Sequence, residues 1–339
     1  MLEEKRVGII GYSSKRYNNF YRKILSDLKI NCTLWNRSAM QYTKLDNEEI
    51  VKDVNQLISA QDIDLVFCFV NDKNNFDFLS QYNFNCPVLI ETPVTDPRWF
   101  DFDRFEVGVL EQWPYYPLEE FKRIIYQKEI IKKPYQLMND GRTFDYHSIA
   151  QLRSFANYAY PTKCIGLVQN VKQEKFKDDF GKYVDNIDDW TYGLSELSNG
   201  AVIIYNFTYN CKKSVLKPYQ LIRHVSSNGS ITTGREKEMG NDYEVGRITY
   251  LNNEKVYESK IEVKSDNQVT KEIFCQDLDI SWKNIFVELS FNDAEVAAAT
   301  LIKRSMEGLF YSAKNAYIDI LTTSAMKQSA HQKQFITFQ

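Results

Sequence analysis

The segment from Arg6 to Ser38 constrains the fold more than any other part of the sequence. Val7-Gly8-Ile9-Ile10-Gly11 is a short apolar run that ends in glycine, which is typical of a strand buried on both faces of a parallel sheet. Tyr17 to Leu28 follows with apolar residues at helical spacing, and Cys32 to Trp35 is expected to form a second buried strand. The segment therefore predicts a strand, a tight turn, a helix and another strand.

A turn between such a strand and helix can bind an anion, because unpaired backbone N–H groups and the helix dipole point at it. The dinucleotide fingerprint has glycine at three positions, which here hold Gly11, Ser13 and Arg16. Ser13 can still admit a phosphate and donate its hydroxyl, whereas Arg16 predicts a slightly displaced helix. We expect Gly11, Tyr12 and Ser13 to bind a cofactor, with an ordinary strand-to-helix turn as the alternative.

Asn36-Arg37-Ser38, at the end of the second strand, bears on which cofactor this is. A carboxylate at this point would bind the ribose 2′-hydroxyl of NAD, and there is none. Arg37 and Ser38 offer a guanidinium and a hydroxyl where a 2′-phosphate would lie. The sequence therefore predicts NADP(H) as the preferred cofactor, with NAD(H) possible, against the alternative of a surface arginine that follows a strand.

The chain has 339 residues and a net charge of −3, and its charges are interspersed, so neither nucleic-acid nor membrane-surface binding is expected. Met-Leu-Glu-Glu-Lys-Arg leads into the first strand without an apolar signal segment, which favours a cytoplasmic location. Six cysteines without a C-x-x-C pair, together with three histidines, disfavour a metal site.

Up to about Gln112 the sequence alternates between strand and helix patterns, which predicts a right-handed, parallel, mononucleotide-binding unit. Asn71 and Glu91 each follow an apolar strand, at the carboxyl edge where ligands bind in such sheets. We expect both residues to contact the cofactor. The predicted helices are 48–60 and 76–82, and the further strands are 64–70, 87–93 and 107–110.

After Gln112 the pattern changes to helices 117–127 and 147–158, followed by strands from 164 to 264. Asn199-Gly200, Asn228-Gly229 and Asn252-Asn253 separate these strands as type I′ hairpin turns do, which predicts an antiparallel sheet. Asn292 with Glu295 indicates a capping box, and helices are expected to about 309 and over 313–328. We place the domain boundary between residues 115 and 116, with 1–115 and 116–339 as the two domains.

The strand around Val202 carries apolar residues on both faces, since Val202 and Ile204 alternate with Ile203, Tyr205 and Phe207. One face can pack on the domain's own helices. We expect the other face to meet a second subunit, so that the protein is a homo-oligomer.

Motif order gives a family resemblance that covers nearly the whole chain. Val7 to Gly11 resembles the opening strand of the glucose–fructose oxidoreductase / inositol dehydrogenase (Gfo/Idh/MocA) family, and Glu91-Thr92-Pro93 resembles its Glu-Lys-Pro turn. Asp140 to His147 resembles its active-site helix start, and Leu197 to Ala201 its Asn-Gly hairpin. The resemblance implies an α/β fold: an N-terminal Rossmann domain followed by an α+β domain with a large, mostly antiparallel sheet.

The resemblance also implies an activity. Family members oxidise or reduce a carbinol or carbonyl carbon, typically of sugars, sugar nucleotides or cyclitols. Here Thr92 replaces the family's catalytic lysine, and Thr143 replaces a frequent aspartate. The enzyme hypothesis has His147 as the general acid or base, with Asp145 or Asp140 orienting it. The alternative is a catalytically degenerate protein that binds a ligand or a partner, because fold does not fix function.

Four further residues are candidates for binding a sugar-like substrate. Gln112 and Trp113 lie at the predicted domain junction, where an aromatic side chain can stack on a sugar face, although core packing is an equal alternative. Arg142 and Tyr146 flank the candidate histidine in sequence.

Overall fold

The structure, a computed structural model, describes residues 2–38, 42–172, 174–175, 177, 183, 187–208, 219–238, 241–266 and 269–338. The chain divides into two compact units, 1–115 with 286–317 and 116–285 with 318–339. The predicted boundary after residue 115 assigned everything beyond it to one domain. In the structure, Phe286–Tyr317 belongs to the first unit instead.

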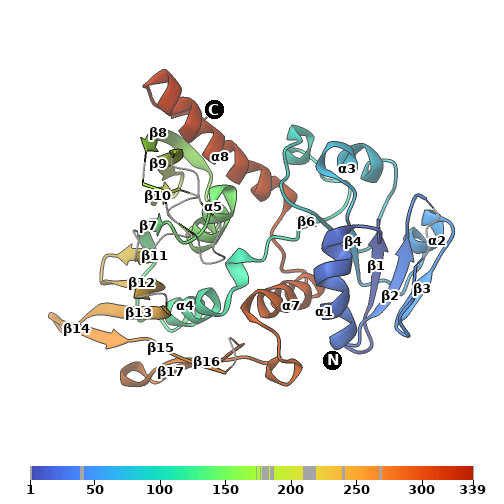
Figure 1. The fold of residues 1–339 in the computed structure, drawn as a ribbon, viewed down its shortest axis with the longest axis horizontal. Helices are drawn as coiled ribbons and strands as arrows, with labels where there is room; N and C mark the ends of the chain where they lie inside the picture. Colours follow the sequence, from blue (N-terminus) through green and yellow to red (C-terminus); the bar gives the residue numbers. More distant parts are fainter. Residues whose placement is uncertain are drawn as a thin grey trace. The chain divides into compact units, whose positions relative to one another are not determined.

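The first unit contains a parallel sheet, which in the described residues has six strands in the order β3-β2-β1-β4-β5-β6 (Figure 1). The predicted Rossmann-type, parallel architecture is confirmed. Its strands are β1 (Arg6–Ile10), β2 (Asn31–Trp35), β3 (Glu48–Ile50), β4 (Leu65–Cys68), β5 (Val88–Ile90) and β6 (Val107–Val109). Its helices are α1 (Arg22–Asp27), α2 (Val54–Ile58), α3 (Asp72–Leu79) and α7 (Asp293–Met306).

Helix α7 shows why the returning segment belongs to the first unit. Asn292 accepts hydrogen bonds from the backbone of Ala294 and Glu295, and Glu295 bonds back to Asn292 N, as the capping-box pattern predicts. Lys23 Nζ on α1 lies 2.8 Å from Glu295 Oε1, so the two helices are joined side by side (Figure 1).

The predicted helix over 48–60 is wrong in its first half. Glu48–Ile50 forms the edge strand β3, and the helix begins only at Val54, where Asp53 and Gln56 form a capping box. The Glu48 carboxylate is buried and accepts hydrogen bonds from distant groups, which stabilises an extended backbone against the local helical pattern. Helix α3 also begins at Asp72, four residues before its predicted start.

The second unit contains a large mixed sheet, which in the described residues has nine strands in the order β14-β13-β12-β11-β7-β10-β9-β8-β18. All pairs are antiparallel except β7 with β10, so the predicted mostly antiparallel sheet is confirmed. The strands are β7 (Pro134–Asp140), β8 (Pro161–Lys172), β9 (Ile187–Leu197), β10 (Val202–Phe207), β11 (Tyr219–Ser226), β12 (Gly229–Glu238), β13 (Asn241–Asn252), β14 (Lys255–Lys260) and β18 (Ile336–Thr337). A smaller sheet contains β15 (Glu262–Asp266), β16 (Val269–Cys275) and β17 (Ile280–Lys283).

The three predicted hairpin turns are present, linking β9 to β10, β11 to β12 and β13 to β14. The helices of this unit are α4 (Pro117–Gln127), α5 (Asp145–Arg153) and α8 (Ala313–Gln332), whose first residues belong to the first unit. Gly166 and Gly193 let α8 lie directly on the sheet, because a Cβ at Gly166 would be 2.0 Å from the carbonyl oxygen of Met326. In the described residues no helix is long and apolar enough to cross a membrane.

Candidate functional site

The carboxyl edge of the first sheet contains a topological switch point between β1 and β4. The chain leaves β1 toward β2 on one side, and β4 continues to β5 and β6 on the other. Sheets of this kind bind ligands at such a switch point. Gly11 lies at this point with φ +83°, and a Cβ there would be 3.3 Å from the carbonyl carbon of Phe69. Both the backbone conformation and the close approach require glycine at this position.

The structure brings together two of the predicted cofactor segments. Ser13 Oγ donates a hydrogen bond to Asn36 Oδ1 at 2.9 Å, and Asn36 Nδ2 donates to the carbonyl of Ser38 at 2.8 Å. The turn after β1 is thereby linked to the end of β2. Arg37 and Ser38 are exposed, and Asn71 is exposed at the start of α3.

Tyr12 packs inward instead of facing solvent. Its side chain is buried, and its ring centroid lies 4.7 Å from that of Tyr42. The Tyr42 hydroxyl donates to Glu48 Oε1 at 2.9 Å, and Arg22 donates to both oxygens of Glu48 at 2.8 Å. Tyr12 therefore contributes to the site through the packing of the segment that follows β2.

Glu48 was not predicted as part of this region. Burial raises the pKa of its carboxyl, but hydrogen bonds from Arg22, the backbone of Leu45, Tyr17 and Tyr42 outweigh that effect, so the pKa lies below its ordinary value. The sequence offered no signal for this cluster, because its members are dispersed between residues 17 and 48 and meet only when β3 pairs with β2.

At the ends of β5 and β6, Arg16 meets two residues predicted to bind ligands. Arg16 Nη2 donates to Gln112 Oε1 at 2.8 Å, and Arg16 Nε lies 3.9 Å from Glu91 Oε1. Burial raises the pKa of the Glu91 carboxyl to about 7, with Arg16 acting in the opposite direction. A π-helical turn, Tyr17–Tyr21, replaces the first regular turn of the helix after Arg16.

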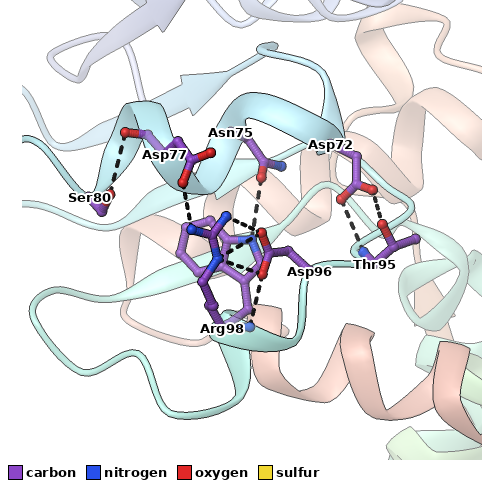
Figure 2. Close-up of polar contacts among 8 residues, drawn as sticks. Asp72, Asn75, Asp77, Ser80, Thr95, Asp96 and Arg98 are labelled. Carbon is purple, nitrogen blue, oxygen red and sulfur yellow. Dashed lines mark hydrogen bonds and ion pairs between the residues drawn. The ribbon is translucent and has the colours of Figure 1, made fainter.

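Helix α3 holds the segment from Thr95 to Arg98, which follows β5 (Figure 2). The Asp72 carboxylate accepts a hydrogen bond from the backbone N–H of Thr95 at 3.0 Å and another from its hydroxyl. Arg98 donates to Asp77 Oδ1 and to Asp96 Oδ2, each at 2.6 Å, as Figure 2 shows. These contacts join the segment after β5 to α3.

The second unit carries the catalytic candidates at the start of α5. The His147 ring lies next to two aromatic rings, 4.8 Å from Phe144 and 4.1 Å from Tyr146 between centroids. Asp145 has φ +48°, and its backbone N–H donates to the Tyr205 hydroxyl at 3.0 Å. The Asp145 carboxylate accepts from Lys327 Nζ on α8 at 3.3 Å, so its described partner is this lysine and not His147.

Other residues of this segment are held by the sheet. Asp140, at the end of β7, accepts a hydrogen bond from Asn206 Nδ2 at 2.8 Å, and Trp190 Nε1 donates to Asn206 Oδ1. Asn206 and Trp190 were not predicted to contact Asp140 or its neighbours. Asn206 reaches Asp140 because β10 pairs with β7, and β7 was not predicted. Thr143, which replaces the frequent aspartate, is buried and donates its hydroxyl to Gln151 at 2.7 Å.

The remaining candidates lie as follows. Trp113 opens a 3₁₀ turn in the first unit, and Arg142 is half-buried after β7. His224 is buried, and its Nδ1 lies 3.1 Å from the Tyr126 hydroxyl, so that burial lowers its pKa well below the ordinary value. In the described part of the chain no group of three or more His, Cys, Asp or Glu residues is arranged to hold a metal ion.

No family model and no curated protein matches the sequence. Solved structures match it over nearly all of both chains. The transcriptional regulator Gal80p from Kluyveromyces lactis aligns with a TM-score of 0.64 and 13% identity, over 99% of this chain and 95% of that one. An oxidoreductase from Agrobacterium radiobacter, in complex with NAD+, L-tartaric acid and magnesium, aligns with 0.62 and 12%, over 98% of each chain. GenD2 from gentamicin A biosynthesis, in complex with NAD, aligns with 0.57 and 10%, over 100% and 97%. The chain has the fold of these proteins, and this is the fold that the family resemblance implied.

Proposed function

We propose that the protein is an NADP(H)-dependent oxidoreductase of the Gfo/Idh/MocA family that transfers a hydride to or from a carbinol or ketone carbon of a sugar, sugar nucleotide or sugar-derived substrate. The observation that supports this most is the switch point between β1 and β4, where Gly11 adopts the left-handed turn and Ser13 contacts Asn36. Two proteins with the same fold, the Agrobacterium radiobacter oxidoreductase and GenD2, are described with NAD bound.

The residues present fit a dinucleotide. Gly11 makes the tight turn that the first fingerprint position needs, and Arg37 and Ser38 are exposed beyond Asn36, where an additional phosphate can reach them. Asn71 and Glu91 lie at the carboxyl ends of β4 and β5 and complete the proposed cofactor site. When bound, the nicotinamide ring supplies or accepts the hydride. An acidic residue at the end of β2 would favour NAD(H), and there is none, so NADP(H) is the preferred cofactor in this proposal.

The protein must then supply a general acid or base for the substrate proton, and we assign that role to His147. Histidine side chains change charge near neutral pH, which suits general acid or base catalysis. Tyr146 packs against the imidazole, and Arg142 lies in the loop before α5, so both are proposed as substrate contacts. Gln112 and Trp113 are proposed contacts from the first unit. Asp145 supports the start of α5 through Lys327 and Tyr205.

The second candidate function is ligand or partner binding without chemistry. It is favoured by Thr92 in place of the catalytic lysine of the resembling family and by the fold shared with the regulator Gal80p. The two candidates agree on nucleotide binding and differ in turnover. A regulator would bind the dinucleotide but leave its redox state unchanged with every sugar-derived substrate tested.

We also propose that the outer face of the large sheet mediates self-association. Leu167, Leu194 and Ile204 lie on neighbouring strands, and the first two are 58% and 45% exposed. With Met138 they line an apolar groove of about 570 Å³. An apolar surface of this kind on a sheet face is typical of a subunit interface.

A fluorescence titration with NADPH and with NADH tests the proposed function. We expect saturable binding of both nucleotides, tighter for NADPH, followed by oxidation or reduction of the bound nucleotide when sugar-derived ketones or carbinols are screened. Failure of both nucleotides to bind at millimolar concentration would refute the proposal.

A further inference from the structure

The start of the helix after β1 breaks a general rule of helix electrostatics. One continuous helical segment runs over residues 15–27, and its first two side chains are the cations Lys15 and Arg16, with no acidic residue in its first turn. The N-terminus of a helix carries a partial positive charge, so cations there are unfavourable unless an anion is also bound. Departures of this kind in natural proteins concentrate at functional sites.

The guanidinium of Arg16 is held by few contacts. One hydrogen bond joins Nη2 to Gln112 at 2.8 Å, and the rings of Phe20 and Tyr21 lie 4.5 and 5.4 Å from the guanidinium carbon. The remaining contact is the ion pair with Glu91 at 3.9 Å, which is too long for a hydrogen bond. The long distance and the 40% exposure of the Arg16 side chain make this a weak ion pair.

Two polar atoms of this ion pair are incompletely satisfied. Arg16 Nε and Glu91 Oε2 are buried and have no hydrogen-bond partner among the described residues. Buried atoms of this kind favour a rearrangement that gives the arginine a better acceptor and leaves the carboxyl neutral. A diphosphate is such an acceptor, because guanidinium and phosphate form paired, charge-assisted hydrogen bonds.

This inference rests on the proposed function. We propose that Arg16 leaves Glu91 to bind the diphosphate of the dinucleotide, and that Glu91 takes up one proton from solvent as it does so. The charges balance: the Arg16 cation passes from a carboxylate to a phosphate, and the abandoned carboxylate becomes a neutral acid. Arginine at the third fingerprint position, where glycine would allow close packing of the helix on the strand, then supplies a side-chain contact to the diphosphate.

The groups around Glu91 determine the pH range over which the affinity for the dinucleotide changes. Arg16 faces it from the helix after β1 and lowers its pKa, the backbone N–H of Thr92 does the same, and Glu111 after β6 raises it. Burial is the largest cause, and the resulting pKa is about 7. Departure of Arg16 raises this pKa further, so binding takes up a proton only above pH 7. Affinity is then constant below pH 7, falls as pH rises above it, and is about tenfold weaker at pH 8 than at pH 6.

The experiment measures dissociation constants for NADH, NADPH and inorganic pyrophosphate at pH 6 and pH 8. NADH lacks the 2′-phosphate, whose own titration would otherwise contribute. The variants are Glu91→Gln, Arg16→Ala and, as a matched control that keeps the charge, Arg16→Lys. Calorimetry in buffers of different ionisation enthalpy measures proton uptake directly, and circular dichroism confirms that each variant is folded.

We expect the wild-type protein to bind NADH about tenfold more weakly at pH 8 than at pH 6, with proton uptake at pH 8. Glu91→Gln should bind about tenfold more tightly than wild type at pH 8 and show no proton uptake. Arg16→Ala should lose about tenfold or more in affinity at pH 6, with Arg16→Lys intermediate.

Three outcomes separate this inference from the proposed function. If NADH binds but Glu91→Gln keeps the wild-type pH dependence, or Arg16→Ala binds like wild type, the inference is wrong and the proposed function stands. If pyrophosphate binds with the expected dependence on Arg16 and Glu91 but neither nucleotide does, the inference stands and the proposed cofactor is wrong. If no probe binds, both are refuted.

Discussion

A buried ion pair at the end of α5 allows a stability prediction that bears on the candidate catalytic helix. Arg153 and Asp319 are fully buried, and Nη1 of the arginine bonds to the carboxylate, joining α5 to α8 within the second unit. Arg153 also donates from Nε to the carbonyl of Ala159 at 3.0 Å and from Nη2 to that of Tyr158 at 2.9 Å. Helix α5, which carries His147 in its first turn, is therefore fixed at its other end by this arginine.

Replacing Asp319 by asparagine keeps the side-chain shape and removes the negative charge. Losing one partner of a buried ion pair costs about 3–5 kcal/mol, because the other charge stays buried without compensation. Arg153 keeps its two carbonyl acceptors, so we expect a loss near the lower end of that range, about 3 kcal/mol. Arg153→Met combined with Asp319→Leu should recover most of this loss, since an apolar pair needs no charge compensation.

Hydrogen exchange of peptides from α5 and α8 measures the opening free energy locally, without assuming that the two units unfold together. Glu258→Ala is the matched control, because the Arg247–Glu258 pair has side chains 65% and 58% exposed, and its loss should cost less than about 1 kcal/mol. The reasoning is wrong if Asp319→Asn leaves exchange in α5 unchanged, or if the double variant opens more readily than the single one.

Three further predictions concern function. Arg37→Ala should raise the dissociation constant for NADPH about 10- to 150-fold, equivalent to about 1.5–3 kcal/mol, and leave that for NADH unchanged; equal effects on both nucleotides would remove the 2′-phosphate assignment. His147→Asn should lower turnover on an identified substrate about 10²- to 10⁴-fold and leave NADPH binding intact, whereas full turnover would mean that the proton comes from another group. Leu194→Glu should shift a sedimentation profile from oligomer to monomer, and a wild-type monomer at micromolar concentrations would contradict the sheet interface.

Elements with local signals were predicted well from the sequence. Pro117 begins α4, as its place in a first helical turn predicts, and Asn292 caps α7. Each of the three hairpin turns contains asparagine or glycine, and the β13–β14 turn has positive φ at Asn253 and Glu254, as a type I′ turn requires. In the described residues of the other two turns, only Gly200 has a positive φ, so these turns are not of type I′. Each of these signals acts within a few residues, so neither the sheet order nor the packing was needed to identify them.

Two of the missed strands, β7 and β3, lack such signals. β7 begins with proline and carries polar residues, and it becomes a strand because β10 and β11 pair with it on either side. β3 begins with Glu48, which by local preference fits a helix. Its carboxylate accepts hydrogen bonds from Arg22 and two tyrosines, and these contacts stabilise the strand. Contacts between residues far apart in sequence outweigh local preference in both cases, and sequence patterns do not report such contacts.

The same distinction explains how far the candidate site could be predicted. Ser13 and Asn36 were both predicted to bind the cofactor, but their mutual hydrogen bond was not, because it joins segments on two strands. The pairing of Asp145 with Lys327 joins residues 182 positions apart, so no local sequence pattern indicates it.

Replacement of two fingerprint glycines, by Ser13 and Arg16, does not by itself indicate that nucleotide binding is lost. Loss of fingerprint glycines would indicate loss of nucleotide binding if the backbone could no longer make the turn. Gly11, at the first fingerprint position, is kept, and its φ of +83° is a backbone conformation that favours glycine. Ser13 and Arg16 instead use their side chains, one toward Asn36 and the other toward Gln112 and Glu91. Side-chain contacts of this kind are compatible with the proposed nucleotide binding, and under our proposal that binding depends on pH.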